Sequence, residues 1–150
     1  MRFMKNYVVK AKELREYVEK IFQAVGLKKE EAESVAELLV HADLRNVRSH
    51  GVLRTVPYVE KIKDGGASKV STYPVVHETA NTAVIDAQGG LGALAGEKAV
   101  KIAGEKAKNN LISMVVVRNS NHFGMGGHWA LKLAGDDMIG FACSNTDLTM

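Results

Sequence analysis

The sequence is poor in cysteine, in aromatic residues and in long apolar runs, and each shortage argues against a class of protein. Its single cysteine, Cys143, has no partner for an intrachain disulfide, which favours a reducing, cytoplasmic setting. Aromatic residues make up only 6% of the chain and no basic stripe accompanies them, so nucleic acid is not an expected partner. No apolar run approaches the ~20 residues of a membrane span. The first residues also lack the apolar core of a secretion signal.

What remains is the composition of an ordinary soluble globular domain. Hydrophobic residues make up 46% and charged residues 25% of the 150 residues, and the formal net charge is +3. That length is enough to bury a core. The lysines are scattered, so the small positive charge forms no evident patch.

Apolar residues at helical spacing predict two amphipathic helices near the start of the chain. The first repeats at Leu14, Val18, Ile21 and Val25, and the second at Ala32, Val35, Ala36, Leu39 and Ala42. Gly26 stands where a left-handed cap would end the first helix. A short turn between them makes an antiparallel pair. Pro57 is expected near the start of a third helix, which Asp64-Gly65-Gly66 ends.

Past residue 66 the pattern changes to short β-type runs. Residues 75–76 and 83–85 suggest a hairpin, and a helix with apolar residues from Leu94 to Ala107 follows. We then expect a buried strand at 112–117, a short helix at 129–134 and a last strand at 138–143. The predicted fold class is α+β (mixed α/β), with a helical N-terminal domain at 1–70 and the first part of a sheet domain at 71–150.

The segment Arg48-Ser49-His50-Gly51 follows the second predicted helix and falls on a connecting loop, where binding residues often collect. Arg54 lies four residues beyond His50, so on a helical turn both could face one pocket. An arginine fork beside an imidazole suits a 2-oxo or 2-hydroxy acid, because one group holds the carboxylate while the other moves a proton. The alternative is a surface loop whose histidine merely caps a helix.

The second polar segment, residues 119–128, follows a predicted strand and precedes a helix. Its glycine-rich turn could present backbone N–H groups to an anion, and the alternative is a simple connector. His122 and His128 lie six residues apart, which matches no usual zinc spacing, so no metal site is expected.

The run Gly90-Leu91-Gly92-Ala93-Leu94-Ala95-Gly96 resembles a dinucleotide fingerprint, with Ala95 in the last glycine position. No carboxylate follows about twenty residues later, although Arg118 could favour a 2′-phosphate. The preceding strand is interpreted as half of a hairpin and not as a parallel unit. We therefore favour close packing of helix on sheet as the role of these glycines.

Ordered motifs through most of the chain resemble the malate/L-lactate dehydrogenase family, the type unrelated to the Rossmann-fold lactate and malate dehydrogenases. The matching stretches are Arg45-Asn46-Val47-Arg48-Ser49-His50-Gly51-Val52 with Arg54 and Pro57-Tyr58-Val59; Arg118-Asn119-Ser120-Asn121-His122-Phe123-Gly124 with Gly127-His128-Trp129-Ala130; and Met138-Ile139-Gly140 with Asn145 and Thr146. The resemblance implies a non-Rossmann nicotinamide-binding fold, NAD or NADP as cofactor, and a homodimer.

The resemblance also implies roles for individual residues. It makes His122 the acid/base histidine, with Ser49 and His50 beside the nicotinamide and substrate as further catalytic residues. Arg54 and Tyr58 fall on the side of the substrate carboxylate. The implied cofactor-binding residues are Ser120, Gly124, Asn145 and Thr146.

The implied reaction is hydride transfer between the nicotinamide cofactor and C2 of a 2-hydroxy or 2-oxo acid, with malate or L-lactate as leading substrates. Family members are longer than this chain. We therefore expect either a fragment of a longer enzyme or a chain that a second polypeptide completes. The alternatives are an inactive truncated fragment that acts as a dimerising module, and a cyclic imino-acid reductase of the same family.

Overall fold

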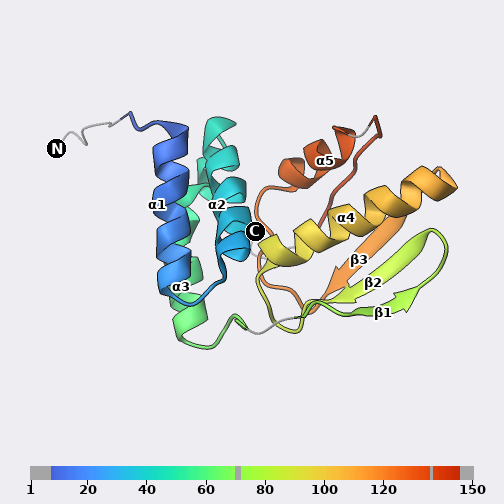
Figure 1. The fold of residues 1–150 in the computed structure, drawn as a ribbon, viewed down its shortest axis with the longest axis horizontal. Helices are drawn as coiled ribbons and strands as arrows, with labels where there is room; N and C mark the ends of the chain where they lie inside the picture. Colours follow the sequence, from blue (N-terminus) through green and yellow to red (C-terminus); the bar gives the residue numbers. More distant parts are fainter. Residues whose placement is uncertain (1–7, 70–71, 136, 146–150) are drawn as a thin grey trace.

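The computed structural model describes residues 8–69, 72–135 and 137–145. Helices α1, α2 and α3 lie together at one side, and a small sheet with α4 and α5 lies at the other (Figure 1). The helices are α1 (Ala11–Ala24), α2 (Lys29–Leu44), α3 (Thr55–Lys63), α4 (Gly92–Asn110) and α5 (Gly126–Ala134), and the strands are β1 (Val75–Glu78), β2 (Thr82–Asp86) and β3 (Met114–Arg118). The predicted mixed α/β fold class is confirmed.

The predicted helix pair is present as α1 and α2. Gly26 has a φ of +101°, a conformation that glycine adopts without steric cost, and it ends α1 as predicted. At the start of α2, the Glu31 carboxylate accepts the Lys28 backbone N–H at 2.8 Å. Pro57 occupies the third residue of α3, within the first turn, where its missing N–H costs no helical hydrogen bond.

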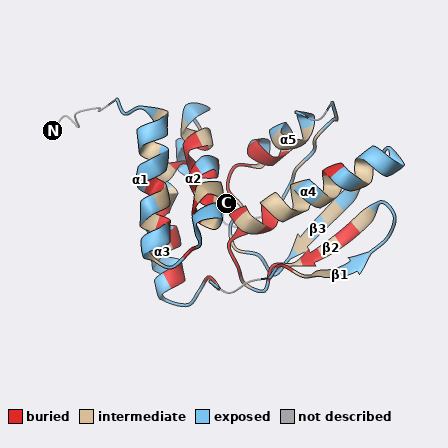
Figure 2. Cartoon of the chain, in the orientation of Figure 1, coloured by how far each residue is buried: buried red, intermediate tan, exposed pale blue. Residues whose placement is uncertain are grey.

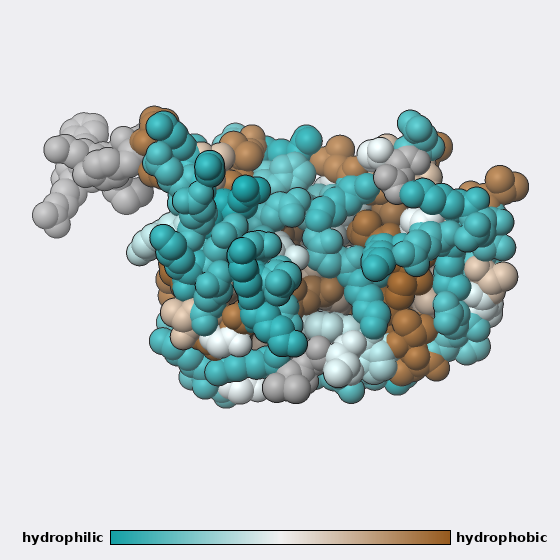
Figure 3. All heavy atoms as spheres, in the orientation of Figure 1, coloured by the Kyte–Doolittle hydropathy of each residue, from teal (hydrophilic) through white to brown (hydrophobic). Residues whose placement is uncertain are grey.

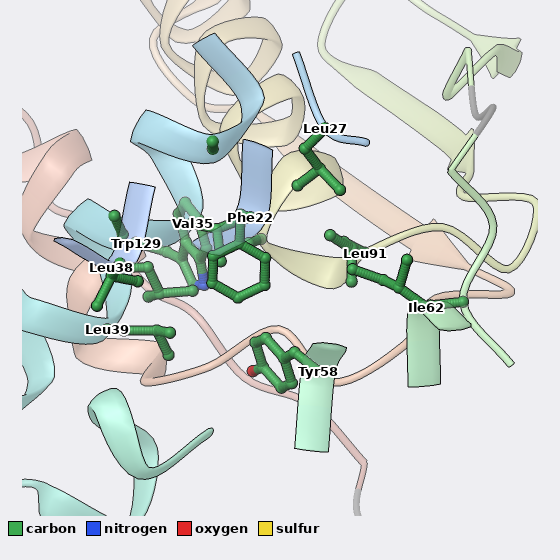
Figure 4. Close-up of a cluster of buried hydrophobic side chains, with 14 residues drawn as sticks. Phe22, Leu27, Val35, Leu38, Leu39, Tyr58, Ile62, Leu91 and Trp129 are labelled. Carbon is green, nitrogen blue, oxygen red and sulfur yellow. The ribbon is translucent and has the colours of Figure 1, made fainter. Parts of the chain in front are cut away.

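One apolar core joins the helical side to the other side of the molecule. Phe22 of α1, Leu38 and Leu39 of α2, and Tyr58 of α3 pack in the same cluster as Trp129 of α5 (Figure 4). Buried residues accordingly gather on the surfaces of α2, α4 and α5 that face one another (Figure 2). The predicted domain boundary falls at residues 70 and 71, which lie outside the described residues, so the division stays a prediction.

The sheet has the order β1-β2-β3. The predicted hairpin is confirmed, since β1 and β2 pair antiparallel. However, β2 also pairs in parallel with β3 along its whole length, from Thr82 with Met114 to Asp86 with Arg118, and α4 makes the crossover. The interpretation of β2 as half of a hairpin and not as a parallel unit was therefore wrong, because one strand has two edges and β2 uses both.

Two strand predictions need correction. The strand expected to be buried, β3, alternates exposed and half-buried residues, because α4 covers only one of its faces. The predicted strand at 138–143 forms no strand at all. This segment packs on α5, where Gly140 lies against the backbone of Ala130, and a β-type sequence without a neighbouring ladder makes no strand.

The glycines of the 90–96 run do permit close packing, but not of helix on sheet. A Cβ on Gly92 would lie 2.6 Å from the His122 carbonyl oxygen, and a Cβ on Gly96 would lie 2.6 Å from Cζ2 of Trp129. The partners of α4 at these positions are thus the loop after β3 and the first turn of α5.

Hydrophilic side chains cover most of the face that α1 and α4 present, with apolar atoms between them (Figure 3). Among the residues that the structure describes, no helix has both the length and the apolar character needed to cross a bilayer.

Gly96→Ala should lower the free energy of unfolding by about 1–3 kcal/mol, because the added methyl group overlaps the Trp129 ring and a packed site resists an extra carbon. Urea denaturation of the variant and the parent chain measures the difference. Gly127→Ala is the matched control, since a Cβ there meets nothing within 4 Å and alanine suits a helix. Equal losses in the two variants would contradict the close approach of α4 and α5.

Candidate active site

His122 lies in the loop between β3 and α5 and meets residues of the helical part. Its Nδ1 is 2.6 Å from the Tyr58 hydroxyl of α3, although the two residues are 64 positions apart in the sequence. The His122 ring also stands 5.2 Å from the His50 ring, measured between centroids. The two polar segments that the sequence singles out therefore converge.

The loop that carries His122 is fixed from several directions. Asn121 donates through Nδ2 to the Gly89 carbonyl at 2.7 Å, and Trp129 donates through Nε1 to the Phe123 carbonyl at 2.9 Å. Gly124, with a φ of +81°, lies against Leu38 of α2 so closely that a Cβ would be 2.6 Å from its Cδ2. These contacts hold the backbone on both sides of His122.

The segment from Arg48 to Arg54 forms two short 3₁₀ turns, Arg48–His50 and Val52–Arg54. The Ser49 hydroxyl lies 2.9 Å from His50 Nδ1, and Arg54 donates through Nε to the Ser49 carbonyl at 2.7 Å. Asp43 of α2 accepts the Val52 N–H at 2.8 Å and passes directly over Gly51, where a side chain would collide with it. The turn is thus anchored to α2, and its Arg54 Nη groups make no ion pair or hydrogen bond with the described residues.

The surroundings of His122 and Tyr58 favour the neutral form of both side chains. Much of the His122 surface is exposed to solvent, yet the partial burial of its ring beside Tyr58 lowers its pKa. The positive charge of Arg54 lowers this pKa further, as do the neighbouring His50 and Lys61. Burial raises the pKa of Tyr58 to about 12. At neutral pH, Tyr58 therefore keeps its proton, and its oxygen can also accept a hydrogen bond from Nδ1 of a protonated His122.

The remaining predicted site residues are placed less uniformly. Ser120 and Gly124 flank His122 in the same loop; Ser120 is exposed and donates to the Asn121 carbonyl at 2.8 Å, whereas Gly124 is buried. Asn145 is exposed in the segment after α5, and within the part of the chain that the structure describes no hydrogen bond joins it to His122, Tyr58 or His50. Thr146 lies outside the described residues.

A second polar group at the carboxyl ends of β2 and β3 was not predicted as a unit. Arg118 pairs with Asp86 through Nη2 at 3.0 Å, and Asn119 donates to the same carboxylate at 3.1 Å. The Gln88 backbone N–H, then Asn119 and Arg118, lower the pKa of Asp86. Arg118, considered from the sequence for a 2′-phosphate, thus already has a carboxylate partner. Only the parallel register of β2 and β3, which no local pattern carries, brings these residues together.

The cluster combines a titratable ring, a hydroxyl partner and an arginine fork at the junction of the two sides of the molecule. Such a set can transfer a proton next to a bound carboxylate. Among the described residues, no three His, Cys, Asp or Glu side chains gather as a metal site would need.

Comparisons with known proteins agree on one family. The family model for malate/L-lactate dehydrogenase matches residues 9–150. A malate dehydrogenase from Pyrococcus abyssi is 39% identical over 142 residues, which cover 94% of this chain and 39% of that protein. An L-sulfolactate dehydrogenase from Methanocaldococcus jannaschii is 34% identical over 95% of this chain and 42% of that protein.

The fold agrees with the sequence comparison. The structure of malate dehydrogenase from Pyrococcus horikoshii matches with a TM-score of 0.81 at 39% identity, over 87% of this chain and 39% of that one. The chain thus spans about two fifths of the length of the relatives it matches.

Tyr58→Phe should lower the pKa of His122 further. The phenol oxygen can accept a charge-assisted hydrogen bond from the imidazolium, and phenylalanine removes that acceptor. An NMR titration of the His122 ring protons measures the shift. Tyr17→Phe, which changes an exposed tyrosine of α1, is the control and should leave the titration unchanged. A higher His122 pKa in Tyr58→Phe would contradict the assigned contact.

Proposed function

The chain belongs to the malate/L-lactate dehydrogenase family, and on that basis we propose that it is part of an oxidoreductase acting on C2 of a 2-hydroxy or 2-oxo acid. Malate and L-lactate are the leading substrates. Similarity to proteins named malate dehydrogenase and L-sulfolactate dehydrogenase supports a hydroxy-acid substrate with an anionic group.

The observation that carries the proposal is the meeting of His122 with Tyr58 and His50 beside the Ser49–Arg54 turn. Arg54 binds the substrate carboxylate through its Nη groups, since its Nε already holds the turn in place. His122 accepts the proton of the C2 hydroxyl in oxidation and returns it to the ketone oxygen in reduction. Ser49 and His50 steady the substrate oxygen.

We propose that Tyr58 positions His122, a role other than the one at the substrate carboxylate that its motif implies. Its hydroxyl lies on His122 Nδ1, so it orients the acid/base ring more directly than it could bind a carboxylate. With Nδ1–H donating to the phenol oxygen, Nε2 of a neutral His122 is left to accept the substrate proton. The lowered pKa of His122 keeps the ring neutral near pH 7, as the oxidation direction requires.

NAD or NADP, when bound, supplies the carbon that accepts or donates the hydride. The carboxyl ends of parallel strands β2 and β3 fit a cofactor of this kind, because ligands of α/β sheets gather at that edge. Gly89, with a φ of +73°, stands at this edge with open space where a side chain would point. Ser120 of the neighbouring loop belongs to the same proposed surface, Gly124 supports that loop from inside, and Asn145 is proposed as a further cofactor contact. The cofactor role of Thr146, which lies outside the described residues, stays a prediction.

We further propose that the chain acts as a homodimer. The rest of the active site then comes either from more of the same polypeptide or from a second one, because the relatives are more than twice as long.

His122→Gln in the complete enzyme should lower kcat by roughly 10²–10⁴-fold, the usual contribution of a general acid or base. Affinity for NADH should stay within the same order of magnitude, because glutamine keeps the size and polarity of the side chain. Steady-state kinetics with malate and fluorescence titration with NADH separate the two effects. His77→Gln on exposed strand β1 is the control. Near-parental turnover of His122→Gln would remove this residue from the acid/base role.

Arg54→Lys should raise KM for the hydroxy acid by roughly 10- to 100-fold, the equivalent of one charge-assisted hydrogen bond, with a smaller effect on kcat. The single ammonium group cannot reproduce the fork that binds a carboxylate. Arg48→Lys changes an exposed arginine of the same segment and should leave KM unchanged. If Arg54→Lys keeps the parental KM, another residue binds the carboxylate.

A further inference from the structure

Three side chains, Arg45, His41 and His128, form a row of contacts that joins α2 to α5. Arg45 donates through Nε to Nε2 of His41 at 2.9 Å. His41 Nδ1 lies 2.7 Å from Nδ1 of His128, which is 87 residues away in the sequence. His128 is 1% exposed, so this contact belongs to the interior.

Arg45 determines which ring nitrogen carries the proton in both His41 and His128. Arg45 can only donate, so Nε2 of His41 must accept and the His41 proton resides on Nδ1. That proton then bonds to Nδ1 of His128, which must be the acceptor. The proton of neutral His128 is therefore on Nε2, a buried atom with no hydrogen-bond partner among the described residues.

This row of hydrogen bonds can exist only while His128 is neutral. A protonated His128 would turn its Nδ1 from an acceptor into a donor that faces the Nδ1–H of His41. Two donors 2.7 Å apart repel each other, so the contact must open or His41 must lose its bond to Arg45. Protonation thus changes the geometry and not merely the charge.

The charges around His128 and His41 come from four helices. Lys132 of α5 faces His128 and pairs with Glu97 of α4 and, at 3.6 Å, with Glu37 of α2. Burial, then Lys132 and His41, lower the pKa of His128 to about 4.

His41 sits at the outer end of this arrangement. Lys12 and Arg15 of α1 line the same hollow as His41. Burial and Arg45 lower the pKa of His41, whereas Glu37 opposes them. Protonating either histidine is therefore unfavourable while these hydrogen bonds are intact.

The row of hydrogen bonds from Arg45 to His128 is linked to the loop that carries His122. The His128 ring meets the Trp129 ring edge to face, with centroids 4.6 Å apart and planes at 89°. Trp129 in turn donates to the carbonyl of Phe123, the residue after His122. Movement at His128 would therefore reach the backbone of the proposed acid/base residue within two contacts.

We infer that Arg45, His41 and His128 form a clasp that positions the His122 loop against α2 and that releases the loop in acid. The clasp makes His128 a positioning residue for the reaction. Its importance for catalysis rests on the proposed function, but its existence does not.

The sign of the pH effect follows from His128. The folded chain binds fewer protons than the unfolded chain between the lowered value, about 4, and the ordinary value of 6.5. The contribution of neutral His128 to stability is therefore fully present above pH 6.5 and is lost as the pH falls toward 4.

Trp129, the one tryptophan of the sequence, reports on the clasp directly. An imidazolium in contact with an indole quenches its fluorescence, and the indole N–H signal in NMR reports its bond to Phe123. In the parent chain, both signals should change together with a midpoint well below pH 6.5, near 4.

Two substitutions at His128 separate positioning from titration. His128→Asn keeps an acceptor near the position of Nδ1 and cannot titrate, so it should hold the indole signal at pH 7 and lose the acid step. His128→Leu removes the acceptor, so it should shift the indole and His122 ring signals already at pH 7. His77→Asn is the control and should keep the parental acid step.

The same acid step in His128→Asn and in the parent chain would overturn the proposal. If the variants do not fold, a long-range ¹H–¹⁵N spectrum of the parent chain decides: protons on Nδ1 of His41 and Nε2 of His128 support the clasp, and any other pair of tautomers rejects it. None of these measurements uses enzyme activity. An inactive chain with an intact acid step would therefore reject the proposed function and leave the clasp in place.

Discussion

The site depends on one constraint. Residues 121–124 pass through a narrow space between α2 and α4. Gly92 lies under the carbonyl groups of Asn121 and His122, and Gly124 lies against Leu38. A methyl group at Gly92 would displace the backbone of the loop, and one at Gly124 would collide with the Leu38 side chain at a φ of +81° that disfavours any side chain. Because this backbone is fixed, the His122 ring reaches Tyr58 without a helix of its own to support it.

Packing and chemistry use the same contacts here. Trp129 fills the space beside Gly96, contributes to the main core, and donates to the carbonyl next to His122. Tyr58 is likewise part of the core, yet its hydroxyl meets the titratable ring. A rigid apolar support that presents a few polar atoms at its edge is a general way to hold a catalytic side chain still.

Two histidines of the same segment differ in what surrounds them. His122 is exposed by area beside a phenol and an arginine, so it can exchange protons with a ligand. His128, six residues further on, is buried where α5 packs on α2, and protonation there would break a hydrogen bond that joins the two helices. Residue type alone does not distinguish these roles; burial and the identity of the neighbouring donor do.

The sequence by itself determined the local elements and the residues that are able to bind a ligand or transfer a proton. Helical spacing, Gly26 and the early position of Pro57 predicted the helices, and polar segments beside glycine marked Ser49, His50, Arg54 and His122. These features are local, since helices and turns depend on neighbours a few positions apart. Motif resemblance added Tyr58 and the family, but not the contact that Tyr58 makes.

Only the tertiary structure decided which of these residues meet. It joined β2 to β3 in parallel, left one face of β3 uncovered, and kept residues 138–143 out of the sheet. It also brought Tyr58 to His122 and His41 to His128, across 64 and 87 positions of sequence. Such pairings carry no local signal, because they arise from how whole helices and strands bury their apolar faces against one another.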